Sequence, residues 1–275
     1  MLIGYYRLGR PINALAGCLL VILSAYVAEP PSWWPVLMAA VTVLLITVST
    51  NAWNDYVDIE IDKVNKPDRP LPSGQVARNS ALIFSIVGTF LSLVAAFFIN
   101  QPALIIAVAS NILLYLYSWK LKCSVLWGNI AVALITALCV IFGGVAAGNI
   151  IPVITLSLAV FFAILGREIL KTMADYRGDF EQNCKTIAVA WGKKKARTYV
   201  LIFLGIAILI IIAIYFIEQY KPAYLFISLF LVCPVLIYVA INSRETMSDR
   251  DLEKSSLIMK YGFFIWFLAV ALGAG

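Results

Sequence analysis

Long apolar runs separated by short polar breaks dominate the pattern of this chain. Each of nine runs has roughly the length, about 20 residues, that a helix needs to cross a bilayer. Proline, glycine and asparagine mark the breaks, as in Asn100-Gln101-Pro102. We therefore predict nine membrane-spanning helices, near residues 11–28, 33–53, 80–99, 102–118, 125–147, 151–173, 198–217, 222–242 and 257–273.

Acidic positions gather into two segments, each at the end of a predicted helix. Asp58 and Asp62 are four residues apart, and so are Asp175 and Asp179. This spacing places each pair on one helix face, where like charges repel. A divalent cation removes the repulsion, and carboxylate oxygens with a phosphate group form the usual shell around Mg²⁺. The pattern thus predicts a magnesium–diphosphate site at a membrane surface.

The same spacing selects the metal ligands. Asn54 lies four residues before Asp58, so three oxygen-bearing side chains recur along one side of the first helix end. We predict that the metal is held by Asn54, Asp58, Asp62, Asp175 and Asp179, and we predict catalytic roles for the four aspartates. Asn51, one turn deeper, is expected to orient the first cluster, and an interhelical hydrogen bond is the alternative reading.

Cationic side chains are also expected, because a diphosphate carries more negative charge than two metal ions need. The candidates for contact with substrate are Arg69, Lys120, Lys122, Lys171, Arg177 and Lys185. An aromatic belt with snorkelling lysines is the alternative for the segment Tyr115–Lys122. Lys193–Lys195 are interpreted as charges that face lipid headgroups.

Composition and charge agree with a membrane protein. The chain is 62% hydrophobic and 13% charged, whereas soluble domains carry about 25% charged residues. All basic residues except Lys221 fall on one side of the predicted spans, which assigns that side to the cytoplasm. The N-terminus is then cytoplasmic and the C-terminus outside. The first apolar run is expected to be a retained helix and no cleaved signal peptide, since it lacks a small-residue cleavage site.

Several other chemistries are disfavoured. The chain has no histidine, which excludes a histidine base and histidine-bound zinc or haem. The five cysteines form no Cys-x-x-Cys pair and are interpreted as small apolar fillers. An ion transporter is disfavoured because the predicted helix centres carry no charge. No nucleic-acid partner is predicted.

The two acidic segments also indicate an internal repeat. Both contain Asp-Tyr, at Asp55-Tyr56 and Asp175-Tyr176, both follow an even-numbered helix, and both precede a basic stretch. A parallel duplication of a four-helix unit with one extra helix fits this arrangement. We predict an all-α fold in a single domain, residues 1–275, with nine helices around a central cavity.

The motifs together resemble those of the UbiA family of intramembrane prenyltransferases. The stretch NDYVDIEIDKVNKPDRPLPSG is similar to the first family motif, and GREILKTMADYRGDFEQNCKTIAV is similar to the second. Arg10-Pro11-Ile12-Asn13 resembles the N-terminal Arg-Pro-x-Asn of the family, which adds Asn13 to the substrate-binding candidates. The family also has a tyrosine–lysine element after helix four, and Tyr117 with Lys120 or Lys122 is the counterpart here.

The resemblance implies Mg²⁺-dependent transfer of a prenyl group from an isoprenyl diphosphate to a lipophilic acceptor in the bilayer. The chain is most similar to the archaeal branch, in which a geranylgeranyl group joins geranylgeranylglyceryl phosphate to form the second ether of the membrane lipid. An aromatic acceptor of quinone biosynthesis, 4-hydroxybenzoate or dihydroxynaphthoate, is the alternative. Asp55 and Glu168 are candidates for accepting the hydroxyl proton. The sequence offers no basis for an oligomeric state.

Overall fold

The computed structural model describes residues 2–274, and every regular element in that range is a helix. Eight of the described helices are long and apolar enough to cross a membrane, and a ninth span results if a pair bent by 49°, Ile3–Gly9 with Pro11–Val27, counts as one. Large apolar side chains such as Phe90 and Leu209 are exposed on these helices, as expected where lipid surrounds them. The predicted all-helical, multi-pass membrane fold is confirmed.

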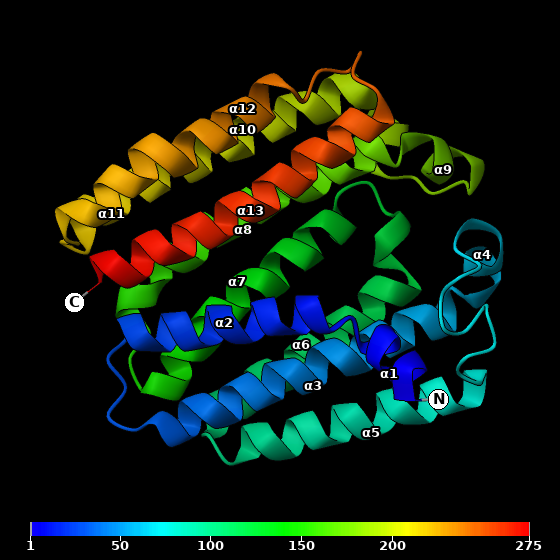
Figure 1. Ribbon diagram of the computed structural model, residues 1–275, viewed down its shortest axis with the longest axis horizontal. Coiled ribbons are helices and arrows are strands. Elements are labelled where there is room, and N and C mark those ends of the chain that lie inside the picture. The colour runs from blue at the N-terminus through cyan, green and yellow to red at the C-terminus, as the bar shows by residue number, and fades with distance from the viewer. Residues whose placement is uncertain (1, 275) are drawn as a thin grey trace. The chain divides into compact units, whose positions relative to one another are not determined.

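The chain divides into two compact units, and the first comprises Met1–Trp119 with Ile141–Ile150. Its helices are α1 (Leu2–Gly9), α2 (Pro11–Val27), α3 (Trp33–Val57), α4 (Ile59–Asn65), α5 (Arg78–Phe97), α6 (Gln101–Trp119) and the end of α7 (Trp127–Ala147). Helix α3 contacts α1, α2, α5 and α6, so it forms the centre of this unit (Figure 1).

Small residues let the helices of the first unit approach closely. A Cβ on Gly88 of α5 would lie 2.9 Å from the Cβ of Ser49 on α3, so only glycine fits this contact. Near the same part of α3, at Ala52, a buried apolar cluster that includes Leu8, Leu71 and Val76 packs the loop after α4 against α1 and α3. This packing fixes the loop that carries Arg69.

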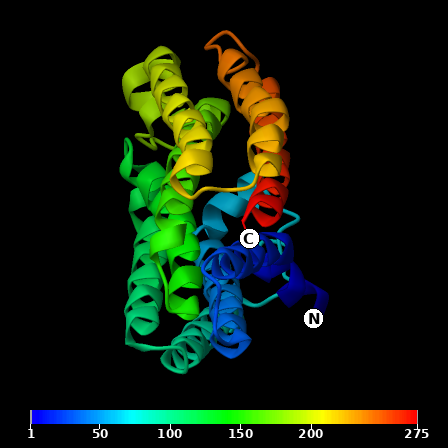
Figure 2. The ribbon, with the colours of Figure 1, turned by 90° about the vertical axis from the view of Figure 1, so that its left-hand side faces the viewer.

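The second unit comprises Lys120–Val140 and Ile151–Gly275. Its elements are η1 (Leu121–Cys123), the first part of α7, η2 (Ile151–Val153), α8 (Ile154–Ala174), α9 (Tyr176–Glu181), α10 (Ile187–Ile217), α11 (Pro222–Ile227), a π-helical turn (Ser228–Val232), α12 (Cys233–Ile241) and α13 (Asp249–Gly273). Helix α8 contacts α10 and α13, and α13 also contacts α11 and α12 (Figures 1 and 2).

Two helices begin earlier than predicted. Helix α10 begins at Ile187 and continues across a kink at Gly192, whose φ of 84° is readily adopted by glycine. Helix α13 begins at Asp249, because the side chain of Ser248 accepts a hydrogen bond from the N–H of Asp251 at 3.2 Å. Lys260 therefore lies about three turns into α13, and the prediction of uncharged helix centres is wrong at this position.

Candidate active site

Both acidic segments lie where a long helix ends and a short helix begins. Asp58 separates α3 from α4, and Asp175 separates α8 from α9. The two residues have nearly the same backbone angles, φ −87° and ψ 6° at Asp58 and φ −83° and ψ 6° at Asp175. Helix ends elsewhere in the chain, such as Gln182 and Asn242, have similar angles, so the predicted duplication stays a prediction.

Hydrogen bonds of the helical type continue through each break and align the two segments. The N–H of Asp58 donates to the carbonyl of Asn54 at 2.9 Å, and the N–H of Asp175 donates to the carbonyl of Lys171 at 2.8 Å. Lys171 in the second segment therefore corresponds to Asn54 in the first. The second segment has a cation where the first has a neutral oxygen ligand.

The three aspartates of the first segment are buried, and Asp55 and Asp62 are paired with arginines. Asp55, Asp58 and Asp62 expose only 2%, 6% and 4% of their surface. Arg69 Nη1 lies 2.5 Å from Asp62 Oδ2 and 3.4 Å from Asp55 Oδ1, and Arg10 Nη2 lies 2.5 Å from the same Asp55 oxygen. Pairing of this kind offsets the cost of removing a carboxylate from water.

Asn54 and Asp58, which were predicted to share one side of the helix end, are in contact. Asn54 Nδ2 donates to Asp58 Oδ2 at 2.8 Å, and Asn54 Oδ1 accepts a bond from the Ser118 hydroxyl at 3.4 Å. Helix α6 therefore contributes Ser118 to the polar end of α3. The contact confirms that the spacing of four brings these two side chains together despite the helix break.

Three further residues of this unit were candidates for substrate contact. Asn51 Nδ2 donates to the carbonyl of Gly9 at 3.0 Å, which fits the alternative reading of a hydrogen bond between helices. Asn13 is exposed on α2, and its side chain forms no hydrogen bond within residues 2–274. Tyr117 is half-buried near the end of α6, one residue before Ser118.

Arg10 was not among the predicted site residues, although it lies within one of the motifs. It separates α1 from α2 with a left-handed φ of 49° and reaches the buried carboxylate of Asp55. The available signal was its place directly before Pro11, because a residue before proline rarely continues a helix. A basic residue at such a break is free to turn toward an acidic helix end.

Asp179 is the centre of the polar contacts in the second segment. Burial raises the pKa of Asp179 to about 6, and the negative charge of nearby Asp175 also raises this pKa. Two groups act in the opposite direction: the Thr186 hydroxyl, which donates to Asp179 Oδ2 at 3.0 Å, and the positive charge of Lys122. Lys122 is therefore the lysine after α6 that acts on this carboxylate. Lys120 is exposed and has no side-chain hydrogen bond or ion pair among the described residues.

The remaining predicted cations are placed differently. Lys171 Nζ lies 3.1 Å from an oxygen of buried Glu168, and Arg177 Nε lies 3.5 Å from Asp249 Oδ2. Lys185 is exposed, without a side-chain hydrogen bond or ion pair in the described part of the chain. Of the six predicted cations, the structure thus brings Arg69 near Asp62 and Lys122 near Asp179. Lys171 lies one helical turn before Asp175.

Two interpretations of residues outside the acidic segments are wrong. Lys193 does not simply face lipid headgroups, because its Nζ lies 2.8 Å from Asp249 Oδ1 and 5.2 Å from the centre of the Tyr176 ring. Cys123 and Cys184 are not apolar fillers, because a disulfide joins them. Neither the Lys193–Asp249 ion pair nor the disulfide could be predicted from local spacing, because each joins segments that are distant along the chain.

The donor types fit magnesium, although the side chains are arranged around arginines. Within residues 2–274, no group of three or more acidic or cysteine side chains converges closely enough to hold a metal ion. Carboxylate and amide oxygens are nevertheless the ligands that Mg²⁺ prefers. Arg69 contacts only Oδ2 of Asp62, and a carboxylate can accept from a cation at each of its two oxygens.

Known proteins are similar to this chain over nearly its whole length. Digeranylgeranylglyceryl phosphate synthase of Methanosphaera stadtmanae is 30% identical over 270 residues, which cover 98% of each chain. A solved structure of a digeranylgeranylglyceryl phosphate synthase matches with 31% identity and a TM-score of 0.85 over 99% of this chain and 98% of that one. A UbiA homologue from Archaeoglobus fulgidus, solved with GPP and Mg²⁺, matches with 22% identity and a TM-score of 0.73, covering 96% and 99%.

The family assignment rests on nearly the whole chain. The model of the UbiA prenyltransferase family matches residues 14–268. That range contains both acidic segments and all the predicted metal ligands. The chain belongs to the UbiA prenyltransferase family and is a membrane-embedded prenyltransferase.

Proposed function

We propose that this protein transfers a geranylgeranyl group from geranylgeranyl diphosphate to the free hydroxyl of geranylgeranylglyceryl phosphate, with release of diphosphate. The product is the doubly alkylated glycerol phosphate of archaeal membrane lipid. The observation that carries this proposal is the full-length similarity to the digeranylgeranylglyceryl phosphate synthase of Methanosphaera stadtmanae and to the solved synthase structure, at 30% and 31% identity.

The acidic segments are proposed to hold the donor diphosphate through magnesium. Asn54, Asp58 and Asp62 would hold one metal ion, and Asp175 and Asp179 would hold another. The neighbouring structure with GPP and Mg²⁺ supports this assignment by its fold. When bound, Mg²⁺ supplies Lewis-acid stabilisation of the negative charge that develops on the departing diphosphate.

The cations of this chain complete the electrostatic part of the reaction. As the carbon–oxygen bond of the donor breaks, its electron pair remains with the diphosphate, and the acceptor oxygen bonds to the allylic carbon. Arg69 and Lys122, which lie beside the aspartates, are placed to stabilise the leaving group. Helix packing in lipid keeps water from the allylic cation.

The hydroxyl proton must pass to an oxygen that is not already paired. Asp55 is held by Arg10 and Arg69, and Glu168 is held by Arg167 and Lys171. Each carboxylate therefore has two cationic partners, and we propose that both position these cations. The departing diphosphate then takes the hydroxyl proton.

The proposed orientation places the acidic segments and the N-terminus in the cytoplasm and the C-terminus outside. Support comes from the basic residues, all of which except Lys221 lie on the side predicted to be cytoplasmic. A cysteine introduced at Asn149 for labelling with a membrane-impermeant maleimide should react from outside, and one introduced at Ser73 should react only after the membrane is opened.

An assay with separate acceptors tests the function. Purified protein in liposomes receives geranylgeranyl diphosphate and Mg²⁺ with either geranylgeranylglyceryl phosphate or 4-hydroxybenzoate. We expect ether product and diphosphate only with the glycerol lipid, and loss of both after chelation of Mg²⁺. Product formed only with the aromatic acid would overturn the proposal, and Asp58→Ala serves as the inactive control.

A further inference from the structure

A basic pocket lies between helices α8 and α13 of the second unit. Its cavity volume is about 400 Å³, and its wall includes one predicted metal ligand, Asp175. Five basic side chains line it, against two carboxylates, Asp175 and Glu253. The basic residues are Arg167, Lys171, Arg250, Lys254 and Lys260.

Helical spacing gathers these residues on facing sides of two helices. On α13 the residues at 250, 253, 254, 257 and 260 recur every three or four positions, and on α8 those at 167, 171 and 174 do the same. Such spacing produces one continuous stripe on each helix. The stripe on α13 exists only because the helix begins at Asp249 and carries these charges within its regular turns.

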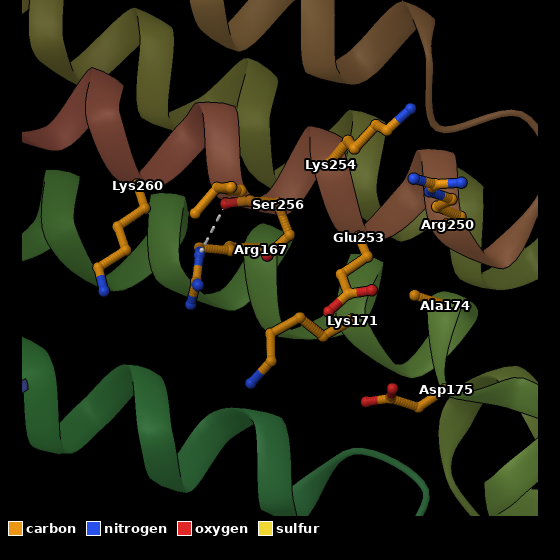
Figure 3. Close-up of a pocket in the computed structure, with 10 residues that line it drawn as sticks. Arg167, Lys171, Ala174, Asp175, Arg250, Glu253, Lys254, Ser256 and Lys260 are labelled. Carbon is orange, nitrogen blue, oxygen red and sulfur yellow. Dashed lines mark hydrogen bonds between the residues drawn. The ribbon is translucent and has the colours of Figure 1, made fainter. Parts of the chain in front are cut away.

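Lys260 is the distinctive residue of the pocket. It is half-buried, about three turns into α13, and forms no hydrogen bond or ion pair within residues 2–274. In Figure 3 its amino group, the guanidinium of Arg167 and the amino group of Lys171 point toward the same side of the pocket. A charge held in an apolar span without a partner is costly unless a ligand of opposite charge approaches it.

The neighbouring cations are partly neutralised by the protein. Arg167 Nη1 and Lys171 Nζ lie 3.0 Å and 3.1 Å from oxygens of Glu168, and Arg167 Nε also donates to the carbonyl of Ser256. Lys254 pairs with Asp251 at 3.5 Å. Lys260 and the exposed Arg250 are the pocket cations left for an anion from outside.

We propose that this pocket binds the phosphate monoester of the acceptor lipid, with Lys260 as its principal contact. Arg250 lies ten residues earlier on α13, about 15 Å along the helix, and in Figure 3 it lies apart from Lys260, Arg167 and Lys171. The inference rests on the proposed function and names the site for the second substrate. Only a few covalent bonds, each about 1.5 Å long, separate the glycerol phosphate from the hydroxyl that is alkylated. The phosphate must therefore be held near the diphosphate ligands, and Asp175 forms part of the same pocket wall.

The pocket suits a monoester better than the donor diphosphate. Its cations lie along an apolar helix whose Leu257 is exposed beside them, so an isoprenoid chain can follow α13 while its head group meets Lys260. The exposed carboxylate of Glu253 faces the same cavity and opposes any bound anion. Lys260 and Glu253 are thus expected to have opposite effects on acceptor affinity.

Kinetic measurements on Lys260→Gln and Glu253→Gln test the proposal, with the exposed Lys194→Gln as a matched control. Loss of one charged hydrogen bond should raise the KM of Lys260→Gln for geranylgeranylglyceryl phosphate about tenfold or more. Glu253→Gln should lower that KM. The KM for geranylgeranyl diphosphate should change in none of them, and Lys194→Gln should match the unmodified protein.

Equilibrium binding separates this inference from the proposed function. Geranylgeranylglyceryl phosphate, geranylgeranylglycerol and inorganic phosphate are each titrated by calorimetry in detergent without donor. We expect tight binding of the phosphorylated lipid alone, weakened by Lys260→Gln even if no ether product forms, in which case only the proposed function fails. Equal binding of the phosphate-free lipid, or equal rises in both KM values, would overturn the pocket assignment.

Discussion

At the scale of single residues, burial controls the charge of Asp179. An aspartate with a pKa of about 6 in the folded protein and 3.8 in the unfolded chain binds more protons when folded between these pH values. Stability contributed by this group is therefore lost as pH rises from about 4 to 6 and is constant above. The ionised carboxylate is the form that binds a metal, so magnesium would compete with the proton at Asp179 if this residue is a ligand as proposed.

This competition gives a measurable pH dependence. We expect the rise in melting temperature caused by Mg²⁺ to be small at pH 5 and to grow through pH 6 to a plateau near pH 7.5, because the proton leaves Asp179 over this range. Thermal unfolding in detergent with and without Mg²⁺ measures it. Asp179→Asn should remove most of the pH dependence, and an unchanged shift between pH 5 and 7.5 would contradict the assignment of Asp179 as a ligand.

Local spacing predicted that Asn54 and Asp58 share one side of a helix, but it predicted none of the contacts from other segments. Asn54 and Asp58 are neighbours because four residues make about one helical turn. Arg10 and Thr186 reach Asp55 and Asp179 through chain turns whose path depends on tertiary packing. No periodicity in the sequence carries that information, so these partners could be found only in the structure.

At the scale of elements, apolar runs located the spanning helices but not their polar ends. Helix α10 was placed too late because Gly192 and three lysines interrupt the apolar pattern at its start. Helix α13 was placed too late because its first two turns are charged, although Ser248 followed by Asp251 is a recognisable helix-start signal. Polar helix ends are thus where hydropathy fails, and they are also where the candidate site lies.

The disulfide between Cys123 and Cys184 links η1, which carries Lys122, to the loop between α9 and α10, which carries Thr186. Lys122 and Thr186 are the partners of Asp179. Closing a loop across 61 positions should stabilise the fold by about 2–4 kcal/mol. Reduction should therefore lower the melting temperature of the unmodified protein to that of a Cys123→Ser, Cys184→Ser double variant. Thermal unfolding with and without dithiothreitol measures this.

The double variant is also the control for that experiment, because dithiothreitol should leave its melting temperature unchanged. A disulfide on a predicted cytoplasmic side is uncommon outside hyperthermophiles, so its redox state can be checked by mass spectrometry of the alkylated protein. If the unmodified protein has two free thiols at these positions after air oxidation, the link between the two elements is not formed.

At the scale of the whole molecule, the duplicated pattern was the most informative feature of the sequence. It placed an aspartate at corresponding points of two helix breaks, and Asp58 and Asp175 have matching backbone angles. The resemblance to a family then supplied the chemistry. Pairing Asp58 with Asp175 also pairs Asn54 with Lys171, because each lies four residues before its aspartate, and the hydrogen bonds across the two helix breaks agree with this pairing.

The duplication also predicts how the two segments cooperate in catalysis. Asp58→Ala and Asp175→Ala should each reduce turnover by about 10²–10³-fold or more while the helical circular dichroism spectrum stays unchanged. When two residues act as a unit on one chemical step, removing either one already removes most of their joint effect on the rate. The double variant should therefore be hardly slower than the slower single variant. Glu245→Ala is the control, because Glu245 is an exposed acidic residue outside both acidic segments. Asp249 would be a poorer control, because it pairs with Lys193 and its loss would disturb packing. Multiplicative losses in the double variant would mean that the two segments serve separate steps.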